Sequence, residues 1–181
     1  QEVLPIKENA TINPSNPYAQ SKLLCEKICK YYADVFTLDI TILRPFNVYG
    51  PDQEKHFLIP EIVEQIKKSK KIIVNSFHPK RDFVYIEDLV HAMTISSKKL
   101  KGFQIYNIGS GVSVSVKEII ELLDDLVEEP LEYEERGIER KGEMMDVIAD
   151  ISAANKSLSW NPKISLREGL KQVLLKEGLC S

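Results

Sequence analysis

Tyr18 and Lys22 stand four residues apart in a segment whose residue types predict a helix. Positions i and i+4 lie one helical turn apart, so the phenol and the ammonium project from the same face. A cation beside a phenol stabilises the phenolate, which can then act as a base for an alcohol proton. Tyrosine and lysine are common residues, and the same pair occurs on ordinary solvated helix faces. The pair is therefore a candidate acid–base centre that needs support from the rest of the chain.

Arg81 and Arg140 are suited to a second kind of chemistry. Guanidinium groups match phosphate oxygens, and two of them together suit one diphosphate. Each arginine also has an ordinary interpretation. Arg81 precedes Asp82 and could form a surface ion pair with it, and Arg140 lies in a charged stretch, residues 134–143, that predicts a solvated loop.

The residues that could do chemistry lie among alternating helices and strands. Asn16 and Pro17 have the residue types of a helix N-cap and first position, and they predict a helix over residues 17–36. The other predicted elements follow in chain order: a buried strand at 38–43, a turn-forming segment at 44–51, a helix at 58–69, strands at 72–75 and 83–86, a helix at 87–99, a strand at 104–108, a helix from a capping box at 115–118 to about 127, a strand at 131–135, a short helix capped by Asp150, and a last helix that begins at a second capping box, 165–168. This alternation predicts an α/β fold.

Composition excludes several classes of protein. The chain has 181 residues, 24 basic and 27 acidic, and a formal net charge of −3. This near balance argues against a protein that binds nucleic acid or an anionic membrane surface, and no apolar run reaches the roughly 20 residues that span a bilayer. The three cysteines, Cys25, Cys29 and Cys180, are an odd number without zinc-ligand spacing. We therefore expect a cytoplasmic protein with reduced thiols and no metal site.

Six motifs fall together in the order and approximate spacing of one family. They are Tyr18-x-x-x-Lys22, Leu43-Arg44-Pro45-Phe46-Asn47-Val48-Tyr49-Gly50-Pro51, Arg81-Asp82-Phe83-Val84-Tyr85-x-x-Asp88, Tyr106-Asn107-Ile108-Gly109-Ser110-Gly111, Arg140-x-Gly142-Glu143 and Leu158-x-Trp160-x-Pro162. The chain resembles the extended short-chain dehydrogenase/reductases that act on nucleotide sugars, the NAD-dependent epimerase/dehydratase family typified by UDP-glucose 4-epimerase. The resemblance covers nearly the whole chain, and it is specific for the family and much less so for the substrate.

The resemblance implies a role for the residues that match the family at the cofactor. Tyr18 would be the catalytic base that takes the proton from the sugar 4-hydroxyl. Lys22 would hold the nicotinamide ribose and support Tyr18. Pro45 and Phe46 would lie beside the nicotinamide ring. The expected cofactor is NAD, in preference to NADP.

The resemblance implies roles at the substrate as well. Asn47 would lie beside the sugar or the diphosphate, and Leu58 with its neighbours would border the nucleotide base. Arg81 and Arg140 would form the diphosphate clamp. The expected ligand is a UDP- or dTDP-linked sugar, and the intact enzyme would be a homodimer. No nucleic acid and no membrane are expected as partners.

The resemblance also implies the fold, the C-terminal part of a Rossmann-like doubly wound parallel sheet with a small α/β substrate-binding domain. Residues 1–56 and 81–112 would belong to the NAD-binding domain, and residues 57–80 and 113–181 to the nucleotide-sugar-binding domain. The family begins with a glycine-rich βαβ part, and nothing in this sequence matches it. Gly109-Ser110-Gly111 offers the start of a G-x-G-x-x-G pattern, but Val114 stands where the third glycine would be. We therefore expect a longer protein of which this chain is a piece.

Two functions of different classes remain open. The first is the C-terminal part of an NAD-dependent nucleotide-sugar epimerase, which oxidises and re-reduces the sugar 4-position through a keto intermediate, with a nucleotide-sugar 4,6-dehydratase as the alternative within the family. On this interpretation the fragment alone would be inactive. The second is a non-catalytic nucleotide-sugar-binding or assembly module, because the cofactor turn is missing. Phe57, where the epimerases often have asparagine, and residues 75–80, where the family usually has glycine, weaken the case for UDP-glucose or UDP-galactose.

Overall fold

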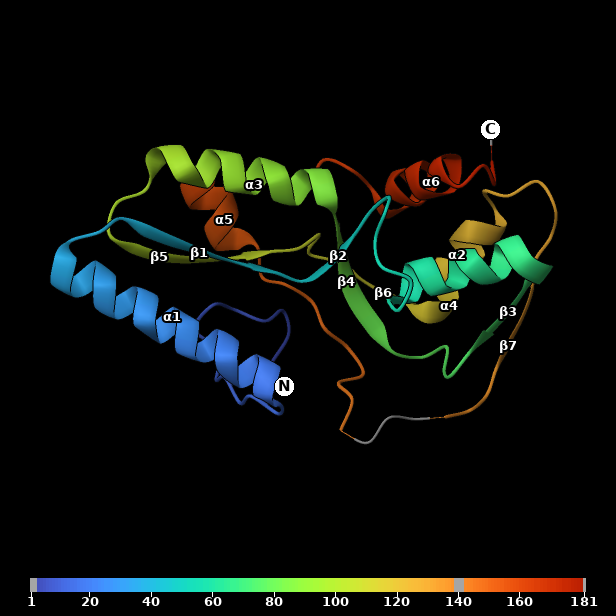
Figure 1. The fold of residues 1–181 in the computed structure, drawn as a ribbon, viewed down its shortest axis with the longest axis horizontal. Helices are drawn as coiled ribbons and strands as arrows, with labels where there is room; N and C mark the ends of the chain where they lie inside the picture. Colours follow the sequence, from blue (N-terminus) through green and yellow to red (C-terminus); the bar gives the residue numbers. More distant parts are fainter. Residues whose placement is uncertain (1–2, 139–141, 181) are drawn as a thin grey trace.

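The computed structural model describes residues 3–138 and 142–180 (Figure 1). The elements in chain order are α1 (Pro17–Phe36), β1 (Ile40–Pro45), β2 (Asn47–Tyr49), α2 (Leu58–Ser69), β3 (Lys71–Val74), β4 (Lys80–Tyr85), α3 (Ile86–Lys99), β5 (Phe103–Ile108), β6 (Ser113–Ser115), α4 (Val116–Asp124), β7 (Glu132–Glu135), α5 (Ser152–Leu158) and α6 (Leu166–Lys176). The pairs β1–β5, β2–β4 and β3–β7 are parallel, and β4–β6 is antiparallel. The predicted α/β fold is confirmed.

Three of the predicted helix starts are confirmed by their hydrogen bonds. The Asn16 side chain accepts the Ala19 N–H (2.8 Å), and both capping boxes are formed. In each box a serine hydroxyl accepts a backbone N–H, and the carboxylate of Glu118 or Glu168 accepts bonds from that serine. Because these bonds favour the ionised carboxylate, they lower the pKa of both glutamates below the usual range.

The predicted cap by Asp150 is wrong, because the N-cap of α5 is Ile151 and no side chain caps this helix. The Asp150 carboxylate accepts the Ser152 N–H (2.9 Å) instead.

The segment at 44–51, predicted as a turn, is in fact mostly strand, and that prediction is wrong. Arg44 and Pro45 complete β1, and after Phe46 the chain continues as β2, which pairs with β4 instead of β5. Pro45 has no backbone N–H to donate to a neighbouring strand, and it is tolerated here because it is the last residue of β1. The N–H of the next residue, Phe46, bonds to the Ile108 carbonyl (2.9 Å). The short strand β6 was not predicted.

One part of the fold is built on β1 and β5, which pair from Ile40↔Phe103 to Pro45↔Ile108. Helix α1 covers one face of this pair, and α3 and α5 cover the other (Figure 1). The buried residues here form one apolar cluster: Val84, Ala92, Tyr106, Ile108, Ala154, Leu158 and Trp160. The indole of Trp160 donates to the Asp88 carbonyl (3.0 Å), so its polar atom is satisfied inside the core.

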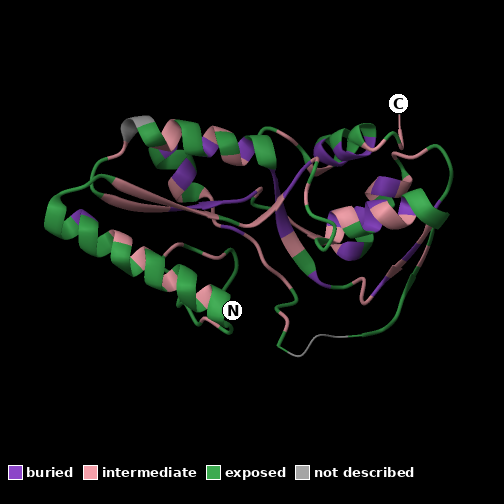
Figure 2. Cartoon of the chain, in the orientation of Figure 1, coloured by how far each residue is buried: buried purple, intermediate pink, exposed green. Residues whose placement is uncertain are grey.

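A second apolar cluster joins α2, α4 and α6 to strands β3 and β4, and these helices carry most of the buried residues on that side (Figure 2). Packing is tight where α6 meets Tyr49. A Cβ added to Gly169 would lie 2.1 Å from the Tyr49 hydroxyl, so only glycine fits there.

Helix α1 differs from the others because Ala33 is its only buried residue. Figure 2 colours most of this helix as exposed, with a few intermediate bands. Its apolar side chains at Leu24, Ile28, Tyr31 and Val35 are each about half exposed or more. Within residues 3–138 and 142–180, the helices all fall short of the length and apolar character needed to cross a membrane.

Candidate functional site

One cavity of about 640 Å³ gathers most of the predicted site residues. Its lining includes these six: Tyr18, Pro45, Phe46, Asn47, Leu58 and Arg81. They come from α1, the β1–β2 segment, α2 and β4, so the fold brings four separate stretches of chain to one place. Lys22 lies next to this lining, with its Nζ 5.2 Å from the centroid of the Tyr18 ring. The predicted clamp residue Arg140 lies outside the described residues.

The helix that carries Tyr18 is held on β1 by a partly buried ion pair. Arg44 donates to both carboxylate oxygens of Glu26, from Nε at 2.8 Å and from Nη2 at 2.6 Å, and its Nη1 donates to the Glu8 carbonyl at 2.8 Å. The bonds to Glu26 raise the pKa of Arg44 above its ordinary value, so this charge is permanent. Arg44 directly precedes Pro45, so the same residue joins α1 to the cavity wall. The Tyr18 side chain itself is 71% exposed and reachable by a ligand.

Asp82 organises the loops around the site from inside. Its carboxylate is completely buried and accepts four bonds: from Ser110 N (2.5 Å), Ser110 Oγ (2.7 Å), Gly111 N (2.9 Å) and Ala149 N (3.0 Å). Its backbone carbonyl accepts from the Asn47 amide (3.0 Å), which fixes the Asn47 side chain at the cavity. A buried carboxylate with four donors is fully satisfied, so Asp82 has a structural role.

These contacts also decide whether Gly109-Ser110-Gly111 suits a dinucleotide. A phosphate-binding turn needs free backbone N–H groups at the start of a helix. The Ser110 and Gly111 N–H groups are instead bound to Asp82. This turn therefore does not fit the cofactor pyrophosphate. The residues expected at the nicotinamide end do lie together, because Tyr18, Pro45 and Phe46 line one cavity and the Lys22 ammonium lies beside the Tyr18 ring.

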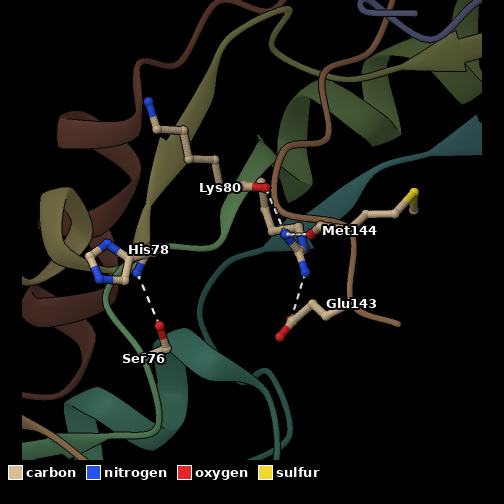
Figure 3. A network of polar contacts seen from close by, with 6 residues as sticks. Ser76, His78, Lys80, Glu143 and Met144 are labelled. Carbon is tan, nitrogen blue, oxygen red and sulfur yellow. Dashed lines mark hydrogen bonds and ion pairs between the residues drawn. The ribbon is translucent and has the colours of Figure 1, made fainter. Parts of the chain in front are cut away.

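Arg81 is held by three bonds (Figure 3). Its Nη2 donates to Glu143 Oε1 at 2.7 Å, and its Nη1 donates to the carbonyls of Lys80 and Met144, each at 2.8 Å. The alternative of a surface ion pair with Asp82 is wrong, because that carboxylate points into the core. The prediction of a solvated loop is also wrong at Glu143, which is 23% exposed and lines the cavity.

Sequence reasoning missed several residues of the cavity wall, above all Arg136 and His56. Arg136 directly follows β7, and its N–H bonds to the Val74 carbonyl (2.9 Å), which brings this part of the chain to the cavity. A basic residue at the end of a predicted strand was the available signal. The His56 ring packs against the ring of Phe57, with centroids 4.3 Å apart. Phe57 is the residue that stands where the epimerases often have asparagine. His78 is outside the lining and 3.9 Å from Glu135.

Comparison with known proteins bears on the whole chain. The family model described as GDP-mannose 4,6 dehydratase matches residues 1–173. The chain belongs to the NAD-dependent epimerase/dehydratase family. Among curated members, the UDP-glucuronate 4-epimerase of Thermodesulfobacterium geofontis is 35% identical over 173 residues, which are 94% of this chain and 53% of the relative. The chain thus spans about half the length of the curated relatives it matches.

Solved structures of the epimerase/dehydratase family agree with the fold. RMD from Pseudomonas aeruginosa, complexed with NADPH, has a TM-score of 0.89 and 28% identity over 96% of this chain and 60% of its own. The UDP-glucose 4-epimerase of Thermotoga maritima, solved with UDP-glucose, has a TM-score of 0.88 and 28% identity over 98% of this chain and 58% of its own. MoeE5, solved with UDP-glucose and NAD, has a TM-score of 0.85 and 26% identity, over 96% of this chain and 59% of its own.

Proposed function

We propose that this chain is the C-terminal part of an NAD-dependent nucleotide-sugar epimerase and carries its catalytic base and substrate clamp. The observation that carries the proposal is the cavity shared by Tyr18, Asn47 and Arg81. A sugar linked to a diphosphate requires a proton acceptor at the sugar and a cation at the phosphates, and the cavity wall offers both. The similarity to a UDP-glucuronate 4-epimerase supports an epimerase ahead of a dehydratase.

Tyr18 and Lys22 would act at the sugar 4-position. The Tyr18 phenolate accepts the 4-hydroxyl proton at its Oη as the alcohol is oxidised, and returns the proton when the ketone is reduced. Lys22 supports the phenolate by its charge and donates hydrogen bonds to the cofactor ribose. Bound NAD supplies the acceptor and donor of hydride. Pro45 and Phe46 exclude water beside the nicotinamide.

The rest of the cavity would hold the nucleotide diphosphate of a UDP- or dTDP-linked sugar. Leu58 borders the base, Asn47 bonds the sugar or the diphosphate, and Arg81 binds phosphate oxygens. Arg140 remains the predicted second arm of the clamp. Arg136, which lines the cavity, adds a further cation to its wall.

The proposal extends to the architecture of the intact enzyme. Strands β1 and β5 would join a larger doubly wound sheet, with residues 1–56 and 81–112 on the cofactor side and residues 57–80 and 113–181 on the substrate side. The exposed apolar side chains of α1, here called the α1 stripe, would pair with a second copy in a homodimer. The stripe consists of Leu24, Ile28, Tyr31 and Val35.

The second candidate, a nucleotide-sugar-binding module without catalysis, is favoured by one observation: the Ser110 and Gly111 N–H groups are committed to Asp82. Calorimetry on the 181-residue chain with UDP-glucose, UDP-glucuronate and NAD tests this second candidate. Tight binding of NAD by this chain alone counts against a module.

The same titrations test the site. Substituting Arg81→Gln removes a charge-assisted contact to phosphate and should weaken UDP-sugar binding at least about tenfold. Arg167→Gln, which removes a positive charge from an ion pair with Asp125 on another part of the surface, is the matched control. Equal UDP-sugar affinity in wild type and Arg81→Gln would contradict the proposed clamp.

A further inference from the structure

Arg81 enters the cavity already paired with a carboxylate. The ion pair with Glu143 is 2.7 Å long, and the two side chains are only 22% and 23% exposed. Salt and water screen a pair of this kind far less than a surface pair. Glu143 therefore cancels much of the charge that Arg81 presents to an anionic ligand.

Two backbone contacts hold the Arg81 guanidinium independently of that ion pair. Its Nη1 donates to the carbonyls of Lys80 and Met144, and the Lys80 N–H in turn bonds to the Met145 carbonyl (2.8 Å). The chain just after Glu143 is thus tied to β4 at two successive residues. Rotation about the side-chain torsions of Glu143 can break the ion pair while the guanidinium and this backbone stay in place.

We propose that Glu143 occupies Arg81 as an internal substitute for a ligand phosphate, so that an incoming diphosphate has to displace it and binds less tightly than it otherwise would. The inference rests on the proposed function. Carboxylate and phosphate oxygens accept the same N–H groups, and two anions held on one guanidinium repel each other. Arg136 lines the same cavity and is exposed, so a diphosphate reaches a second cation as it displaces Glu143. Glu143 therefore sets the affinity of the site for its charged ligand.

This assignment predicts a gain of affinity on removal of an acidic residue from the cavity wall. Calorimetry on the full 181-residue chain would use UDP and inorganic pyrophosphate as probes. Glu143→Gln keeps a hydrogen-bond acceptor for Arg81 but removes the charge, and it should bind both probes about fivefold more tightly or better. Glu143→Ala should also exceed the wild type. In an Arg81→Gln background the Glu143→Gln substitution should change affinity less than about twofold, because the displaced contact no longer exists.

Glu177→Gln, which removes a charge from an ion pair away from the cavity, controls for net charge and should leave both affinities unchanged. Circular dichroism of each variant verifies folding before titration. Weaker or equal binding by both Glu143 variants would overturn the inference and leave the proposed function standing, because the wild type would still bind UDP. A chain that binds neither probe in any variant would overturn the proposed function and the inference together. Tighter binding by both variants, lost in the Arg81→Gln background, is the result that supports it.

Discussion

Asp82→Asn is the substitution whose cost follows most directly from the structure. The variant amide keeps the shape of the carboxylate but replaces one acceptor oxygen with an NH2 group. If the NH2 takes the place of Oδ2, it faces the N–H groups of Gly111 and Ala149, and both donors lose their acceptor, the Ala149 N–H inside the core and the Gly111 N–H partly buried. If it takes the place of Oδ1, it faces the Ser110 N–H, while the Ser110 hydroxyl can still donate to Val112. At least one donor that is buried or partly buried is left without a partner in either orientation.

Close packing prevents an easy repair of that loss. A Cβ added at Gly109 would lie 2.6 Å from the Ala149 Cβ and 2.7 Å from Asp82 Oδ2, so the surroundings leave little room for water. Each unsatisfied buried donor costs about 1–3 kcal/mol, and bonds to a charged acceptor are stronger than neutral ones, so Asp82→Asn should lower the free energy of unfolding by about 2–4 kcal/mol.

Urea unfolding followed by the fluorescence of Trp160, the single tryptophan and fully buried, measures this difference. Asp125→Asn is the control, because Asp125 pairs with Arg167 on the surface and its loss should cost less than about 1 kcal/mol. If Asp82→Asn unfolds at the same urea concentration as the control, the structural role of the Asp82 carboxylate is refuted.

Three further expectations concern stability and assembly. The pKa values of Glu118 and Glu168 are lowered in the fold, so the stabilising effect of these carboxylates is present above the unfolded-state pKa of about 4.3 and is lost as pH falls through the folded-state pKa. The urea midpoint of the wild type should therefore drop between about pH 5 and pH 3, and that of the variant with both glutamates changed to glutamine should drop less steeply. Parallel curves for the two proteins would exclude the capping boxes as the cause. Gly169→Ala should destabilise the fold by about 1–3 kcal/mol because the new Cβ meets the Tyr49 hydroxyl, and a thermal midpoint equal to wild type would contradict the packing. Ile28→Asp in the intact protein should convert a dimer into a monomer by light scattering, and an unchanged mass would rule out the α1 stripe as the dimer surface.

The parts of the fold that sequence predicts well are those set by neighbouring residues. Asn16 with Pro17, and the serine–glutamate pairs at 115–118 and 165–168, begin helices through bonds that span three residues, so local spacing is sufficient. Strand partners are a different matter. At Phe46 the chain passes from β1, which pairs with β5, to β2, which pairs with β4, and this change of partner depends on strands that are distant in the sequence. The local signals there, proline and glycine, are those of a turn.

The candidate site shows the same division. The helical spacing of Tyr18 and Lys22 and the family resemblance predict most of the candidate site residues, six of which line the cavity. The pairing of Arg81 with Glu143 joins residues 62 positions apart, and the partners of the Asp82 carboxylate lie 28 to 67 positions away. Local spacing carries no information on such contacts, and a charged stretch such as 134–143 therefore reads as solvated until the fold is known.

The central claim, that Tyr18 is the base of a nucleotide-sugar epimerase, is tested most directly by Tyr18→Phe in the intact protein that carries this chain. Turnover would be measured as interconversion of 4-epimers of UDP-glucuronate and of UDP-glucose with NAD present, and binding of each substrate by calorimetry. We expect substrate affinity within about twofold of wild type and a loss of turnover of about 10²-fold to 10⁴-fold, the usual contribution of a general base. Turnover within tenfold of wild type at unchanged affinity would contradict the assignment.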